Sequence, residues 1–269
     1  MNQQPIGVFD SGLGGLTAVR QLRKLLPSEQ IIYFGDTARV PYGNRSRDTL
    51  LQYAKQDLRF LNGFDLKAIV IACGTVSTNC LEDLRAESAV PVTGVVEPAA
   101  AKAAELTRNG KIGLIATRAS VASGAYESAL RNMNPALSIQ ALACPLCVPL
   151  VEEGRCRPGD VVIETVAKEY LEPLREAGTD TLILGCTHYP LLLDVIGGIM
   201  GPDVRLIDVG AEAARQCRDL LAAKDALAGG PGGVSCYTSD RAANFQRLAS
   251  LFLGEDLSGK VEQVDIAQY

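Results

Sequence analysis

The chain has 269 residues, a length that fits one large domain or two of ordinary size. Its 26 basic and 31 acidic residues give a net charge of −5, so there is no basic excess with which to neutralise nucleic-acid phosphates. Hydrophobic residues make up 47% of the chain and charged residues 21%, shares typical of globular proteins. Composition therefore argues against disorder and against nucleic acid as a partner.

Short aliphatic segments alternate with helix-periodic segments along the whole chain. The predicted strands are Ile6–Phe9, Ile31–Phe34, Ala68–Ala72, Val92–Val96, Ile112–Ala116, Ser138–Ala143, Leu182–Leu184, Val204–Ile207, Val234–Tyr237 and Val261–Val264. The predicted helices include Leu16–Leu26, Thr49–Leu61, Ser120–Leu130, Val161–Glu176, Ala211–Leu227 and Ala242–Phe252. Apolar strands that alternate with amphipathic helices indicate parallel sheets with helices on both faces. We therefore expect a doubly wound α/β fold that binds ligands beyond the carboxyl ends of its strands.

The segment from Asp10 to Gly15 reads Asp-Ser-Gly-Leu-Gly-Gly and connects the first predicted strand to a helix. Glycines in such a turn allow tight bending and expose backbone N–H groups to an anion. The segment departs from G-x-G-x-x-G and lacks the lysine of a P-loop, so it favours a carboxylate or amino-acid cradle over a nucleotide site. The alternative is a plain turn in which Ser11 or Asp10 caps the helix.

Two segments of the chain echo each other, Leu66–Thr75 and Thr181–His188. In each, an aliphatic strand ends in a small residue, followed by a cysteine (Cys73 or Cys186), by a threonine within two positions, and by a helix. The first turn of a helix favours a thiolate over a thiol. Two such sulfurs facing across a cleft could take a proton from one face of a carbon and deliver one to the other, as inversion of a stereocentre requires. The alternative is two inert cysteines at strand ends.

The remaining cysteines do not indicate a disulfide framework or a metal site. Cys144 and Cys147 have the spacing of a zinc-binding pair, but the chain has no matching second pair and a single histidine. The N-terminus has no secretory signal, and no apolar segment is long enough to span a bilayer. We therefore expect a cytoplasmic protein with no membrane partner and no bound metal, in which the cysteines are free or catalytic.

Three further polar positions are ambiguous from the residues alone. The turn-rich segment Gly35–Gly43 is typical of a surface loop. His188 is the single histidine, and its place two residues after Cys186 leaves a functional role and a packing role equally open. Glu152 follows an apolar segment and would by itself be taken for the solvated end of a helix.

Together these segments resemble the glutamate racemases of the aspartate/glutamate racemase family. The resemblance covers residues 7 to 191, and the segments that carry it, in the order of the family, are Gly7–Gly15, Gly35–Gly43, Ala72–Thr75, Cys144–Leu146, Val151–Gly154 and Gly185–Leu191. It implies two α/β lobes with the active site in the cleft between them. The second lobe is inserted in the first, which suggests residues 1–97 plus 207–269 for one lobe and residues 98–206 for the other.

The resemblance also implies a role for each matching residue. Cys73 and Cys186 would be the two proton donors and acceptors, with Asp10 assisting Cys73, and with His188 and Glu152 assisting Cys186. The substrate would be bound by side chains and backbone N–H groups of Asp10, Ser11, Tyr42, Gly43, Gly74, Thr75, Thr187 and His188. One position departs from the family, in which an asparagine usually stands where this chain has Gly74. We expect asparagine to be tolerated there and to add one hydrogen bond to the substrate.

The function implied is interconversion of L-glutamate and D-glutamate without a cofactor, which supplies D-glutamate for peptidoglycan. No nucleotide-binding motif and no recognisable pyridoxal-phosphate lysine is present, so we expect no cofactor. The partner expected is the small-molecule substrate, and the resemblance adds a homodimer. The alternatives are an aspartate racemase or another two-cysteine racemase, a non-catalytic amino-acid binding protein, and a thiol–disulfide oxidoreductase, although the usual C-x-x-C at a helix start is missing.

Overall fold

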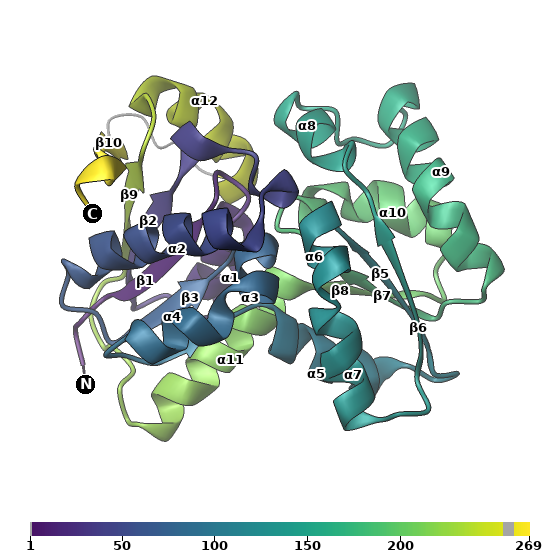
Figure 1. The fold of residues 1–269 in the computed structure, drawn as a ribbon, viewed down its shortest axis with the longest axis horizontal. Helices are drawn as coiled ribbons and strands as arrows, with labels where there is room; N and C mark the ends of the chain where they lie inside the picture. Colours follow the sequence, from purple (N-terminus) through teal and green to yellow (C-terminus); the bar gives the residue numbers. More distant parts are fainter. Residues whose placement is uncertain (1, 255–260) are drawn as a thin grey trace.

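The structure is a computed structural model that describes residues 2–254 and 261–269. Its strands form two separate sheets, each within its own lobe (Figure 1). The first sheet has six strands in the order β10-β9-β2-β1-β3-β4, and every pair of neighbours is parallel. These strands are β1 (Ile6–Asp10), β2 (Gln30–Gly35), β3 (Ala68–Ile71), β4 (Val92–Thr93), β9 (Gly233–Thr238) and β10 (Val261–Gln263).

The second sheet has four strands in the order β6-β5-β7-β8, again all parallel. They are β5 (Lys111–Ala116), β6 (Ser138–Ala143), β7 (Thr181–Leu184) and β8 (Arg205–Asp208). The predicted α/β class with two parallel-sheet lobes is confirmed. The bounds predicted for the lobes stay a prediction. Strands β5 to β8 lie together in the second sheet, so the predicted bound at residues 206/207 falls inside β8.

Helices connect successive strands on both sides of the sheets. They are α1 (Leu16–Leu25), α2 (Arg47–Asn62), α3 (Gly74–Asn79), α4 (Leu81–Glu87), α5 (Val96–Leu106), α6 (Arg118–Ser123), α7 (Ala125–Met133), α8 (Cys147–Glu152), α9 (Val161–Glu176), α10 (Leu193–Met200), α11 (Val209–Ala223) and α12 (Ala242–Leu253). Short 3-10 turns lie at Thr37–Arg39, Tyr42–Asn44, Tyr189–Leu192 and Ile266–Gln268.

The first sheet is buried on both faces, as a doubly wound fold requires. Ile6 and Val8 of β1 belong to one apolar cluster, which they share with Leu22 of α1. Phe9 of the same strand belongs to a second cluster, with Leu58 of α2. Because successive side chains of a strand point to opposite faces, α1 and α2 cover opposite sides of the sheet. This explains why the strands read as unbroken apolar segments.

Two predicted elements differ in kind from the observed ones, and others differ only at their ends. The segment Val92–Val96 was predicted as a strand, but only Val92–Thr93 pairs, because Val96 already begins α5. The segment Ser120–Leu130 was predicted as one helix, but it is split into α6 and α7. Gly124 adopts φ 65°, a left-handed conformation that ends α6, and glycine adopts it without a steric penalty.

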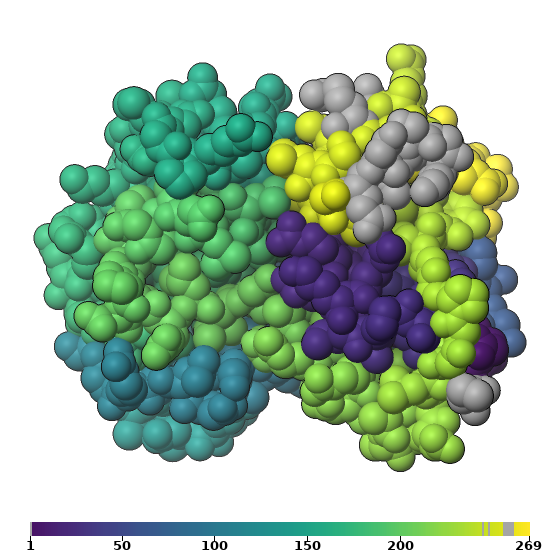
Figure 2. All heavy atoms as spheres, turned by 180° about the vertical axis from the view of Figure 1, so that it is seen from behind, coloured from purple at the N-terminus to yellow at the C-terminus, as the bar shows by residue number. Residues whose placement is uncertain are grey.

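The chain passes between the lobes twice, through α5 and back through α11, and these two helices pack against each other (Figure 1). Seen from behind, the two lobes form separate masses with a notch at one edge (Figure 2). Within the described ranges, no helix combines the length and apolar character needed to span a bilayer. All eight cysteines are free thiols.

Candidate active site

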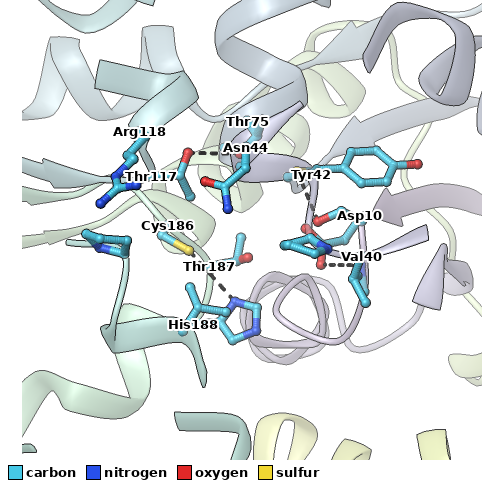
Figure 3. Close-up of a pocket in the computed structure, with 18 of the residues that line it drawn as sticks. Asp10, Val40, Tyr42, Asn44, Thr75, Thr117, Arg118, Cys186, Thr187 and His188 are labelled. Atoms are coloured by element: carbon cyan, nitrogen blue, oxygen red, sulfur yellow. Dashed lines mark hydrogen bonds between the residues drawn. The ribbon is translucent and has the colours of Figure 1, made fainter. Parts of the chain in front are cut away.

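A cavity of about 380 Å³ lies between the two lobes, where the carboxyl ends of β1, β3, β5 and β7 face one another (Figure 3). Every site residue predicted from the sequence lines this cavity: Asp10, Ser11, Tyr42, Gly43, Cys73, Gly74, Thr75, Glu152, Cys186, Thr187 and His188. The ends of parallel strands are where a doubly wound sheet binds ligands, and two such ends supply the two cysteines. The cavity therefore receives one thiol from each sheet.

Cys73 follows β3 in the first lobe and is 3% exposed. Its Sγ lies 3.5 Å from the hydroxyl oxygen of Ser11. Burial and the negative charge of Asp10 raise the pKa of the Cys73 thiol to about 12. Burial likewise raises the pKa of the Asp10 carboxyl, although the charge of His188 opposes this. At neutral pH the first-lobe sulfur is therefore held as a thiol.

Cys186 follows β7 in the second lobe and belongs to a chain of three polar side chains. Its Sγ lies 3.7 Å from Nδ1 of His188, and the Nε2 of that imidazole lies 3.0 Å from Oε1 of Glu152. Burial lowers the pKa of His188, but hydrogen bonds to Cys186 and Glu152 outweigh it and raise the pKa to about 10. An imidazole with a pKa of about 10 carries a positive charge at neutral pH, and this charge lies beside the Cys186 sulfur.

The glycine-rich segment after β1 serves close packing between the lobes. A Cβ atom on Gly14 would lie less than 3.0 Å from the Thr187 hydroxyl and from the His188 ring. The Thr17 hydroxyl donates to the Thr187 carbonyl oxygen at 2.9 Å, across the same contact. The Gly12 N–H donates to the Asp10 carboxylate at 3.0 Å, so this N–H already has an acceptor within the protein. The alternative of a side-chain cap is wrong, because α1 begins without one.

Gly74 makes a second close contact between the lobes. A Cβ atom at this position would lie less than 3.0 Å from the backbone carbonyl oxygen of Gly185. A backbone oxygen cannot swing aside as a flexible side chain can, so one of the two strand-end turns would have to move. This contact argues against asparagine at position 74, whose tolerance stays a prediction. Gly74 instead allows the turns that carry the two cysteines to touch.

Tyr42 lines the cavity, but its hydroxyl points away from it (Figure 3). The hydroxyl donates to Asp36 and lies 3.3 Å from Asp57, and both carboxylates are fully buried. Arg39 bridges the same two carboxylates, with its Nε 2.5 Å from Asp36 and an Nη 2.9 Å from Asp57. What Tyr42 and Gly43 can offer a ligand is therefore their backbone, on a loop held from behind by this ionic network.

The sequence missed several residues that also line the cavity, among them Asn44, Thr117, Arg118 and Cys144. The Thr117 hydroxyl lies 3.0 Å from that of Thr75, so it links the lobes beside the cavity. Thr117 and Arg118 directly follow β5, and the strand-end rule could have found them, because this strand was predicted correctly. Among the residues that the structure describes, no cluster of His, Cys, Asp or Glu is placed to hold a metal ion.

Comparison with known proteins shows the family to which the chain belongs. The model of the Asp/Glu/Hydantoin racemase family matches residues 17–217. The chain belongs to this family of racemases.

Its relatives are similar along their whole length. The chain is 45% identical to the glutamate racemase of Geobacter metallireducens over 99% of this chain and 98% of that protein. A solved glutamate racemase isoform from Bacillus anthracis has a TM-score of 0.93 and 37% identity, covering 98% of both chains. The glutamate racemase of Francisella tularensis, solved in complex with D-glutamate, has a TM-score of 0.92 and 36% identity, covering 100% of both.

Proposed function

We propose that this protein is an isomerase that interconverts L-glutamate and D-glutamate, with Cys73 and Cys186 as its two acid–base groups. The observation that carries the proposal is that Cys73 and Cys186 line the same cavity. Each follows the carboxyl end of a strand, and the two strands belong to separate sheets. A substrate Cα held between them meets one sulfur on each face. Relatives named glutamate racemases, one of them solved with D-glutamate, support glutamate as the substrate.

The surroundings of the two sulfurs support a definite starting state for L-glutamate. We propose that Cys186, whose Sγ lies beside the His188 imidazole, starts as the thiolate, and that Cys73, whose thiol pKa is raised by burial and by Asp10, starts as the thiol. The Cys186 thiolate takes the Cα proton of L-glutamate, and the Cys73 thiol delivers its proton to the opposite face. The product is D-glutamate, with Cys73 left as thiolate and Cys186 as thiol, which is the starting state for the reverse reaction.

The Cα proton of an amino acid is very weakly acidic, so the cavity must stabilise the negative charge that develops. We propose that backbone N–H groups of the turns after β1, β3 and β7 and the hydroxyls of Ser11, Thr75 and Thr187 hold the carboxylates and ammonium group. Fixed donors in a site closed to water stabilise developing charge without first having to reorient. Asp10, Glu152 and His188 act on the sulfurs, as positioning and charge-tuning groups.

Three wider aspects of the function are part of the same proposal. The D-glutamate formed supplies peptidoglycan synthesis, as the resemblance to glutamate racemases implies. Eight free thiols support a cytoplasmic location, because reducing compartments keep cysteines unpaired. A homodimer stays a prediction, and sedimentation of the purified protein over a range of concentrations tests it.

A polarimetric assay tests the proposed function. Purified protein with L-glutamate, no added cofactor and excess chelator should drive the circular dichroism of the amino acid to zero. L-aspartate under the same conditions tests the alternative of an aspartate racemase, and should keep its signal. A protein that binds glutamate in calorimetry but leaves its dichroism unchanged would be a binding protein, and the proposal would be wrong.

A further inference from the structure

We propose that Arg118 is a specificity-determining residue, which pairs with the side-chain carboxylate of the substrate at the mouth of the cavity. This rests on the proposed function, since it assigns the recognition of one group of that substrate. Three observations carry it: the place of Arg118 in the cavity, its lack of a partner, and its place in its helix.

Arg118 is the one arginine or lysine among the described residues that line the cavity (Figure 3). The two sulfurs are 3% and 7% exposed and so lie at its floor, whereas Arg118 is exposed and lies at its mouth. When the substrate Cα lies between the two sulfurs, the α-carboxylate and the ammonium group stay close to them. Only the substrate side chain can extend towards the mouth of the cavity. For glutamate, that side chain ends in a carboxylate, and the charge at the mouth is positive.

The other charged groups of the cavity are already engaged. His188 is held by Cys186 and Glu152, and the Asp10 carboxylate accepts the Gly12 N–H. The side chain of Arg118 makes no hydrogen bond and no ion pair with any part of the chain that the structure describes. Its guanidinium is therefore available to a ligand, and an arginine fork matches the geometry of a carboxylate.

The position of Arg118 in α6 offers no gain in stability that would explain an arginine there. It is the first residue of α6, directly after the Thr117 cap. Unpaired N–H groups make this end of a helix electropositive, so a cation there is unfavourable for stability. An unpaired cation in an unfavourable position beside a substrate cavity is better explained by binding than by folding.

Arg118→Gln tests the assignment, with Arg131→Gln as the matched control. Arg131 is an exposed arginine in α7 that does not line the cavity. A hydrogen bond to a charged group is worth enough that Arg118→Gln should raise KM for L-glutamate about 10- to 100-fold, with kcat little changed. Arg118→Lys should recover part of the loss, and Arg131→Gln should match the wild type.

L-glutamine separates recognition of the carboxylate from general damage to the cavity. It has the shape of glutamate without the charge, so its inhibition constant should be the same for the wild type and for Arg118→Gln. The selectivity for glutamate over glutamine should therefore shrink by the same factor by which KM rises. A KM for Arg118→Gln within about twofold of the wild type, or an equal weakening of both ligands, would overturn the assignment.

Calorimetry tests the role of Arg118 independently of whether the protein racemises glutamate. If the wild type binds glutamate without racemising it, the proposed function fails, yet the dissociation constants of glutamate and glutamine for the wild type and for Arg118→Gln still decide the role of Arg118. If the wild type racemises glutamate and the selectivity does not change, the function stands and the role of Arg118 falls.

Discussion

The Nδ1 atom of His188 lies 3.7 Å from the Sγ of Cys186, whereas the Sγ of Cys73 lies 3.5 Å from a neutral hydroxyl, that of Ser11. One sulfur thus has a cationic neighbour and the other has a neutral one. The two thiols that the sequence presents as equivalent are therefore electrostatically different. In the proposed mechanism, this difference makes Cys186 the sulfur that takes the Cα proton of L-glutamate.

The first prediction is that His188 titrates near pH 10 in the folded protein. Burial opposes its protonation, but the hydrogen bonds to Cys186 and Glu152 raise its pKa from 6.5 to about 10. Because it is the single histidine, its ring signals in an NMR titration need no assignment. Glu152→Gln removes one of the raising interactions, so the midpoint should move to lower pH. A wild-type midpoint near 6.5 would contradict this account.

The raised pKa of His188 makes the stability of the folded protein depend on pH. A group whose folded pKa is raised contributes stability that is fully present below its unfolded pKa, here about 6.5, and is lost as the pH rises through about 10. The difference in unfolding free energy between the wild type and His188→Asn should therefore shrink across this window. Urea titrations at several pH values measure it.

The second prediction concerns Gly74. A methyl group at this position would collide with the Gly185 carbonyl, so Gly74→Ala should force the two strand-end turns apart and lower kcat about 100-fold. Gly198 in α10 has open space around its position, and Gly198→Ala should leave kcat unchanged and stabilise the protein by about 0.4–1 kcal/mol. If Gly74→Ala turns over at the wild-type rate, the contact does not hold the sulfurs in place.

The third prediction concerns the ionic network behind the Tyr42 loop. Arg39→Met leaves the buried carboxylates of Asp36 and Asp57 without their cation, and should lower the free energy of unfolding by about 3–5 kcal/mol. Arg47→Met breaks a surface ion pair with Asp83 and should cost less than about 1 kcal/mol. Equal costs in urea titrations would show that the network is no more than a surface ion pair.

Much of this site could be predicted from sequence, because its chemistry lies at strand ends. Cys73 and Cys186 follow unmistakable aliphatic strands, and parallel sheets bring such ends to one edge. The sequence cannot show how close two turns from different lobes come. From the sequence, Gly74 was therefore interpreted as the loss of a hydrogen bond to the substrate. In the structure, the Gly185 carbonyl oxygen occupies the space that a side chain at position 74 would need.

The sequence also could not show in which direction a side chain points. Tyr42 belongs to a segment shared with the family, yet its hydroxyl turns to Asp36, a residue whose burial depends on the packed loop and on α2. Arg118 was overlooked because one arginine at a helix start has no pattern of its own. It becomes informative only when the lobes bring it to the same cavity as the two thiols.

The central claim is that each turnover needs both sulfurs, and the racemisation rates of Cys73→Ser and Cys186→Ser test it most directly. A hydroxyl is far less acidic than a thiol, so neither serine can replace the missing proton carrier at neutral pH. Cys80→Ala, in which a buried cysteine outside the cavity is changed, is the control, and should keep the wild-type rate. We predict that both serine variants fail to racemise L-glutamate and D-glutamate in the dichroism assay while still binding them in calorimetry. Racemisation by either serine variant at more than a few percent of the wild-type rate would contradict the two-thiol mechanism.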